Sequence, residues 1–190
     1  MKYDCIHLAA GLSSRMGAWK LLLKYNNKTI LQNSLDNALK YTGNVYISGG
    51  SKINELKENI QTNERIKIIE NPDYEKGMFT SIKAALPYIK SDKFFIVLSD
   101  MPLIPPEIYK QMSNVEFSNA LFPVKNGKRG HPVLIKSSLI DLISQFPDSG
   151  TMRDFLNSYP VSEIEVQSDG IFFDVDTELD YGKLLNRDTN

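Results

Sequence analysis

The sequence contains little of what disulfides and zinc sites require, since its 190 residues include one cysteine and two histidines. Cys5 has no second thiol for an internal disulfide, and no Cys/His cluster has the spacing of zinc ligands. Because Cys5 lies in an apolar segment, we expect it to be a small buried hydrophobic residue. These absences predict a protein of the reducing cytoplasm.

Neither an excess of one charge nor a long apolar run is present. The 22 Lys and Arg are matched by 23 Asp and Glu, for a formal net charge of −1, so the chain lacks the basic field that holds nucleic acid. No apolar run approaches the ~20 residues of a membrane span. A first strand begins almost at Met1, so we expect no targeting peptide, no membrane partner and no nucleic-acid partner.

The two best-known phosphate-binding loops, G-x-x-x-x-G-K-[ST] and G-x-G-x-x-G, are also missing. Residues 8–20, L-A-A-G-L-S-S-R-M-G-A-W-K, instead follow an apolar run with small residues, two hydroxyls and two cations. Gly11 lets the backbone approach an anion, and consecutive N–H groups after a strand form an anion-binding nest. Arg15 can fork onto phosphate oxygens, and Lys20 supplies a point charge. The segment favours a polyphosphate ligand; a solvated surface turn is the alternative.

Apolar, strand-like runs alternate with helical periodicities up to Asp100, which predicts an α/β fold. Every crossover is long enough to hold a helix, so we expect a right-handed, doubly wound, mostly parallel sheet. Strands are expected near residues 5–8, 45–47, 66–69 and 94–98, and helices near 29–39, 53–60 and 78–89. Residues 21–24 are expected to be extended, with a turn at Asn26-Asn27.

The second half of the chain has a different pattern. Residues 121–124 and 133–135 flank a polar turn, as in an antiparallel hairpin. Two short helices, a last strand near residues 171–175 and a C-terminal helix from about Thr177 are expected to follow. Without repeats or linkers, the chain is predicted to be one domain. We assign nucleotide binding to residues 1–103 and acceptor binding to residues 104–190.

Carboxylates follow two of the expected strands. Asp100 ends the most hydrophobic strand, at the sheet edge where open α/β sheets bind ligands. A carboxylate there can hold Mg²⁺ together with phosphate oxygens, or simply begin a turn before Pro102. Asp174 and Asp176 precede the last expected helix, where either can be an N-cap. Two carboxylates from distant segments over one triphosphate would form a metal site for phosphoryl chemistry.

The run L-A-A-G-x-S-x-R-M-G-x-x-K at residues 8–20 resembles the signature of the MobA-like nucleotidyltransferases, most closely the molybdenum cofactor cytidylyltransferase branch. The resemblance covers nearly the whole chain in five segments and implies a Rossmann-like nucleotide-diphospho-sugar transferase fold. It also implies that the first loop holds the triphosphate. The loop residues concerned are Leu8, Ala9, Ala10, Gly11, Leu12, Arg15 and Lys20.

A second similar segment, residues 71–81, matches the family pattern N-x-x-x-x-x-G-M-x-x-S. The resemblance implies nucleotide contacts from Asn71, Gly77 and Ser81. A Pro-Leu-x-Gly loop, which guanylyltransferase relatives carry at this place, is missing, and this favours a pyrimidine nucleotide. On residue types alone, an ordinary loop and helix cap is the alternative.

Two further segments concern the acceptor and the metal. Residues 129–133 match R-G-H-P-V, which implies acceptor contacts from Arg129, Gly130 and His131; a solvated hairpin tip is the alternative. Residues 175–179 resemble the family's D-T-P-E-D-L run, with Glu178 in place of Pro. The resemblance implies that Asp176 is the second metal ligand, and Asp174 is the alternative ligand.

Together these resemblances imply that CMP is transferred from CTP to a phosphorylated acceptor, with release of pyrophosphate. The first acceptor they imply is molybdopterin. Arg15, Lys20 and Asp100 are the implied catalytic residues, and Mg²⁺ on Asp100 and Asp176 is the implied cofactor. A molybdoenzyme or its maturation factor is a further implied partner. The alternatives are transfer to another phosphorylated sugar, alcohol or purine-pathway compound, and a non-catalytic molybdopterin-binding accessory protein.

Overall fold

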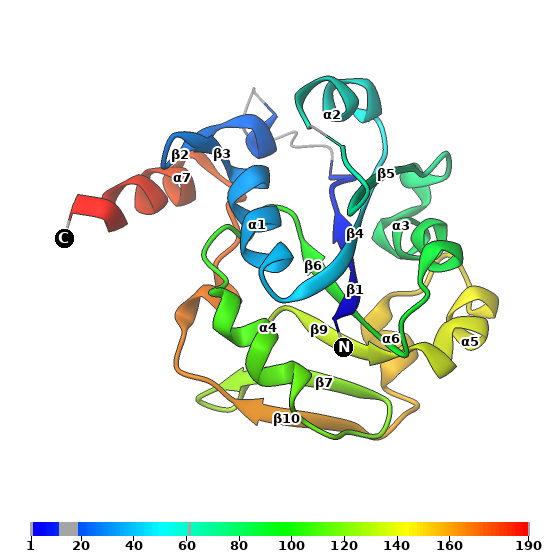
Figure 1. The fold of residues 1–190 in the computed structure, drawn as a ribbon. Helices are drawn as coiled ribbons and strands as arrows, with labels where there is room; N and C mark the ends of the chain where they lie inside the picture. Colours follow the sequence, from blue (N-terminus) through cyan, green and yellow to red (C-terminus); the bar gives the residue numbers. More distant parts are fainter. Residues whose placement is uncertain (1, 12–18, 61, 190) are drawn as a thin grey trace.

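The computed structural model describes residues 2–11, 19–60 and 62–189. A central sheet has the strand order β10-β7-β9-β6-β1-β4-β5, with β8 paired to β7 (Figure 1). Its strands are β1 (Tyr3–Leu8), β4 (Thr42–Gly49), β5 (Ile66–Glu70), β6 (Lys93–Leu98), β7 (Ala120–Lys125), β8 (Lys128–Arg129), β9 (Val133–Lys136) and β10 (Val161–Glu165). Strands β9 and β8 run against the other six. The predicted α/β fold with a mostly parallel sheet is therefore confirmed.

Helices cover both faces of this sheet (Figure 1). One face packs against α1 (Ile30–Leu39), α2 (Ile53–Asn59) and α4 (Pro106–Ser113), and the other against α3 (Met78–Ala85), α5 (Ile140–Gln145) and α6 (Met152–Leu156). Successive side chains of a strand point to opposite faces, so Cys5 joins the first core and Ile6 the second. Both residues are fully buried, so β1 is covered on both faces, and its polar residues Asp4 and His7 are buried as well.

The order of the strands creates the place where a ligand can bind. From β1 the chain moves outward to β4 and β5, and it then returns to β6 on the other side of β1. Ligands of open α/β sheets bind in the crevice outside the carboxyl ends of the strands at such a switch point. Here the loops after β1 and β6 begin side by side, because Ser99 N donates a hydrogen bond of 3.1 Å to Leu8 O.

After the first loop, the chain forms a short 3-10 helix, η1 (Lys20–Leu22), and then a hairpin of β2 (Lys24–Tyr25) and β3 (Lys28–Thr29). The expectation of an extended segment at 21–24 is wrong at its start, because the N–H of Leu22 donates to Trp19 O. The turn at Asn26-Asn27 is confirmed, with φ of 48° and 62°. Thr29 caps α1, the helix predicted near residues 29–39, and accepts a 3.0 Å hydrogen bond from Gln32 N.

The last strand was predicted in the wrong place. Residues Asp169–Phe172 form a 3-10 helix, η5, and the edge strand is β10 instead. Segment 169–175 cannot join the sheet because it packs against the loop after β6, where a Cβ on Gly170 would lie 2.0 Å from Leu103 O. Ile171 and Val175 are fully buried there, so their apolar character reflects loop packing and not strand pairing.

The predicted C-terminal helix is present as α7 (Glu178–Leu185), with Thr177 as its N-cap. It lies beside the β2–β3 hairpin (Figure 1), and the two share a small core that includes Tyr25 and Leu184. Helix α4, which begins at a Pro-Pro pair, had no counterpart in the sequence analysis. None of the helices in the described part of the chain has the length and apolarity needed to cross a membrane.

Candidate functional site

Three of the predicted site residues meet at the carboxyl edge of the sheet. The Lys20 ammonium lies 2.5 Å from Asp100 Oδ2 and 2.6 Å from Asp176 Oδ1. The side chains of Lys20 and Asp100 are 11% and 14% exposed, whereas that of Asp176 is 48% exposed. The cluster is therefore closed on the side of the sheet and open to solvent on the side of Asp176.

Local structure explains why each residue of this cluster is held in place. Lys20 opens η1, directly after the buried Trp19. Asp100 follows β6, and its backbone oxygen accepts a 3.1 Å hydrogen bond from Val175 N. That bond joins the two acidic segments, which are far apart in the sequence. The Asp176 side chain thereby reaches the end of β6.

The start of α7 fixes the other end of the acidic segment. Thr177, directly after Asp176, forms a capping box with Asp180: the Thr177 hydroxyl accepts from Asp180 N, and Thr177 N donates to Asp180 Oδ2. Such a cap orders the first turn of a helix. The family's Pro, replaced here by Glu178, is thus not needed to define where this helix begins.

The charges of the cluster depend on one another. Burial raises the pKa of the Asp100 carboxyl, although the charge of Lys20 acts against this shift. For Lys20, burial acts to lower the pKa, but the carboxylates outweigh it and the pKa of the ammonium is raised. Lys20 therefore remains a cation at neutral pH, between two acidic side chains.

The residues present fit a divalent cation that also takes ligands from a nucleotide. Asp100 Oδ1 is buried and has no hydrogen-bond partner among the described residues. A buried carboxylate oxygen without a partner is costly unless something binds it. No group of three or more His, Cys, Asp or Glu in the described chain could hold a metal ion. Two carboxylates would therefore need phosphate or water oxygens to complete the set, as is usual for Mg²⁺.

The first loop is described only at its two ends. Leu8 and Ala9 are buried, Ala10 is half-buried and Gly11 is exposed. Ala9 N donates to Ser48 O, which continues the pairing of β1 with β4 into the loop. Leu12 and Arg15, both predicted to bind nucleotide, lie outside the described residues, and their roles stay predictions.

Trp19, for which the sequence indicated no role, is buried within the core beside Lys20. The ammonium of Lys52, from the loop after β4, lies 5.7 Å from the centre of its ring. Sequence reasoning missed Lys52 because nothing in the linear pattern joins it to Trp19. It adds a cation at the rim of the same sheet edge.

The predicted nucleotide loop after β5 is held together by its own side chains. The Asn71 amide donates to the hydroxyls of Thr80 and Ser81, each at 2.9 Å, and all three residues are buried. Gly77 has a φ of 116°, which favours glycine, and is exposed directly before α3. The structure thus gives Asn71 and Ser81 a supporting role, and their contacts with nucleotide stay predictions.

This loop also packs closely against the end of β4. A Cβ on Gly50 would lie 2.6 Å from the Cβ of Tyr74, so a larger residue there would force the loop after β5 outward. The close approach of Gly50 to Tyr74 depends on the tertiary fold.

The three predicted acceptor residues have different surroundings. Arg129 Nε donates a 2.6 Å hydrogen bond to Glu163 on β10. A Cβ on Gly130 would lie 2.5 Å from Ile171 O, so this glycine permits the packing that carries Ile171 toward the acidic segment. Burial lowers the pKa of His131, while a hydrogen bond to the Ile96 backbone and the charge of Asp174 act in the opposite direction. Acceptor binding by these residues stays a prediction.

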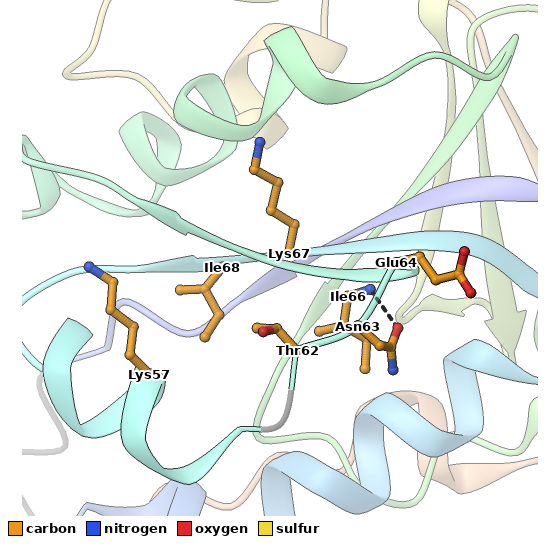
Figure 2. A pocket seen from close by; sticks show the side chains of 7 residues that line it. All are labelled: Lys57, Thr62, Asn63, Glu64, Ile66, Lys67 and Ile68. Carbon is orange, nitrogen blue, oxygen red and sulfur yellow. Dashed lines mark hydrogen bonds between the residues drawn. The ribbon is translucent and has the colours of Figure 1, made fainter.

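A separate surface groove of about 420 Å³ lies along the edge strand β5 (Figure 2). Figure 2 shows Lys67 pointing to the opposite side of β5 from Ile66 and Ile68. Lys67 lies 4.0 Å from the centre of the Tyr88 ring, and Lys57 lies 3.0 Å from a carboxylate oxygen of Glu70. The groove contains none of the predicted site residues. Its lining residues are Lys57, Thr62, Asn63, Glu64, Ile66, Lys67 and Ile68.

The model of the MobA-like NTP transferase domain matches residues 5–164 of the chain. The chain belongs to the MobA-like NTP transferase family. It is 36% identical over 178 residues to the molybdenum cofactor cytidylyltransferase of Escherichia coli K12, covering 94% of this chain and 93% of the relative. The predicted resemblance is confirmed, and this member of the MobA-like family is a nucleotidyltransferase.

Other members and structures of similar fold cover the chain as fully. A probable molybdenum cofactor guanylyltransferase of Bacillus cereus B4264 is 28% identical over 96% of this chain and 95% of its own length. The crystal structure of Rv0371c from Mycobacterium tuberculosis H37Rv matches with a TM-score of 0.85 at 23% identity, over 98% of each chain. The crystal structure of its complex with manganese matches with a TM-score of 0.81 at 21% identity, over 98% of this chain and 99% of that chain. These structural matches show that the chain shares the fold of Rv0371c.

Proposed function

We propose that this protein transfers CMP from CTP to molybdopterin, with Mg²⁺ as its metal and pyrophosphate as the second product. The observation that carries the proposal is the meeting of Lys20, Asp100 and Asp176 at the switch point of the sheet. The choice of CTP and molybdopterin is supported by the 36% identity to a molybdenum cofactor cytidylyltransferase. The 28% identity to a probable guanylyltransferase is lower.

In the proposed reaction, an oxygen of the acceptor's terminal phosphate attacks the α-phosphorus of CTP. A new P–O bond forms there, the bond to the bridging oxygen of the β-phosphate breaks, and its electron pair leaves with pyrophosphate. Two anions must be brought together, so positioning and charge neutralisation are the main tasks of the protein. Lys20 and Arg15 hold phosphate oxygens, and the backbone amides of the first loop orient the triphosphate.

Asp100 and Asp176 would hold Mg²⁺, which supplies positive charge to the phosphate oxygens during the transfer. Asp100 Oδ1 supports this assignment, because it is a buried acceptor without a hydrogen-bond partner among the described residues, and a cation would satisfy it. A relative in fold, Rv0371c, has been crystallised with manganese, which supports a divalent metal in general. A cytoplasmic location follows from this proposed role.

We infer that residues 1–103 bind the nucleotide and residues 104–190 the acceptor, with one exception. Asp176 belongs to the second half but contacts Lys20 of the first. The two halves therefore share the metal site. Asn71, Gly77 and Ser81 are assigned to the cytosine side, and Arg129, Gly130 and His131 to the acceptor side.

The proposal is tested by measuring pyrophosphate release with each of the four nucleoside triphosphates, with and without molybdopterin. Release with CTP that requires molybdopterin is the expected result. Release only with another phosphorylated acceptor would replace molybdopterin. Tight molybdopterin binding without release under any condition would instead indicate an accessory protein.

The Lys20→Ala and Asp100→Ala variants test the site in the same assay. Removing one charged contact to a reacting phosphate costs about a hundredfold or more in rate, so we expect both variants to lose transfer while remaining folded by circular dichroism. Lys28→Ala is a matched control, because Lys28 also pairs with a carboxylate, Asp36, but at the surface. Near-native transfer by either site variant would show that the assignment is wrong.

A further inference from the structure

One ammonium group serves two carboxylates in the site. Lys20 Nζ is within 2.6 Å of an oxygen of both Asp100 and Asp176. It therefore stands between the two groups to which the proposed function assigns the metal. The remaining Asp100 oxygen, Oδ1, is buried and has no partner among the described residues.

We propose that Lys20 is the resident cation of this site in the nucleotide-free protein, so that a divalent cation binds there only together with a nucleoside triphosphate. The inference rests on the proposed function, because that function assigns Asp100 and Asp176 to the metal. It adds a second task for Lys20, which is to occupy the metal position until the nucleotide arrives.

Electrostatics explains why the metal would not enter alone. A divalent cation that approached both carboxylates would come close to the Lys20 ammonium, and the repulsion between like charges at such distances is strong where water is largely excluded. The ammonium and Asp100 are mostly buried, so solvent screens this repulsion weakly. Moving Lys20 away without a new anion to receive it would leave a desolvated charge unpaired.

A triphosphate supplies the missing anion. Its oxygens offer new acceptors to the ammonium, and the flexible stem of a lysine allows the head group to move. The backbone need not follow, because η1 is fixed by hydrogen bonds of Leu22 N to Trp19 O and of Leu23 N to Lys20 O. Asp176 is half exposed, so the exchange is open to solvent from its side.

The consequence is a thermodynamic coupling between metal and nucleotide. If nucleotide draws Lys20 away from the carboxylates, it raises the affinity for metal, and the metal must raise the affinity for nucleotide by the same factor. Removing the ammonium should therefore give the carboxylate pair its metal affinity without any nucleotide. The Lys20→Met variant does this with little change in side-chain length.

The test is calorimetric titration of Mn²⁺ into the full-length protein without nucleotide, with the unfolding temperature as a second readout. We expect Lys20→Met to bind Mn²⁺ at least about tenfold more tightly than the wild type, since it lacks the competing charge. Mn²⁺ should also raise the unfolding temperature of this variant more than that of the wild type. Lys28→Met, which removes an equally short ion pair at the surface, should behave like the wild type.

Adding Asp100→Asn to Lys20→Met should abolish the gain; if the gain persists, the ion binds elsewhere and the inference fails. Equal Mn²⁺ affinity in the wild type and Lys20→Met would also overturn it. Should Lys20→Met not fold, Lys20→Gln replaces it. The wild type alone is also decisive: tight Mn²⁺ binding without nucleotide that Asp100→Asn removes would overturn the inference. Because these titrations contain neither CTP nor acceptor, failure of the pyrophosphate assay contradicts the proposed function and leaves their result intact.

Discussion

At the scale of single residues, the site separates two aspartates that are two positions apart. Asp176 contacts Lys20 at 2.6 Å, whereas no ion pair joins Asp174 to a cation in the described part of the chain. We therefore expect Asp176→Asn to reduce transfer by about a hundredfold, as loss of a charged group at a reacting phosphate does, and Asp174→Asn to reduce it much less. Steady-state rates at saturating and limiting Mg²⁺ measure the difference. A larger loss in Asp174→Asn would exchange the two assignments.

At the scale of elements, the position of Asp176 depends on the capping box that begins α7. Thr177→Ala removes the hydroxyl that accepts from Asp180 N, and loss of such a cap costs about 1 kcal/mol of unfolding free energy. Transfer should fall as well, because Asp176 directly precedes the cap, and Thr177→Ser should restore both. Urea unfolding and the transfer assay are the two measurements.

The start of α6 offers a matched control for this prediction. Thr151 and Asp154 form the same capping box there, but α6 packs on the opposite face of the sheet from α1. Thr151→Ala should cost a similar free energy of unfolding and leave transfer unchanged. Equal losses of transfer in the two alanine variants would mean that the cap of α7 has no special effect on the site.

Element patterns also show how much of the fold the sequence could predict. A buried parallel strand such as β6 shows as an apolar run, and residues that follow parallel strands converge at one sheet edge, which is why Asp100 was expected at the edge where ligands bind. The prediction of a last strand near residues 171–175 was wrong because Ile171 and Val175 are buried by loop packing, which leaves the same apolar pattern as a strand. The partner of Arg129, Glu163, lies 34 positions away on a strand that was not predicted.

At the scale of the whole molecule, unfolding free energy should depend on pH through one core histidine. His7 on β1 is fully buried, and neither ring nitrogen has a partner among the described residues. Burial lowers its pKa from 6.5 to about 3. Between these values the unfolded chain binds a proton that the folded protein does not. The free energy of unfolding is therefore not reduced by His7 above about pH 6.5. It falls as the pH drops toward 3, by at most about 1.4 kcal/mol per pH unit.

The His7→Phe variant isolates this contribution, because it keeps a ring of similar size in the core and removes the titrating group. We expect urea unfolding between pH 4.5 and 7.5 to show a steeper loss of stability on acidification for the wild type than for the variant. The difference should approach about 1.4 kcal/mol for each pH unit below 6. Contributions of His131 and of the carboxylates are common to both proteins and cancel in this comparison. Parallel pH profiles would mean that His7 is already protonated in the fold, or is solvated there, and that burial in the first core does not keep it neutral.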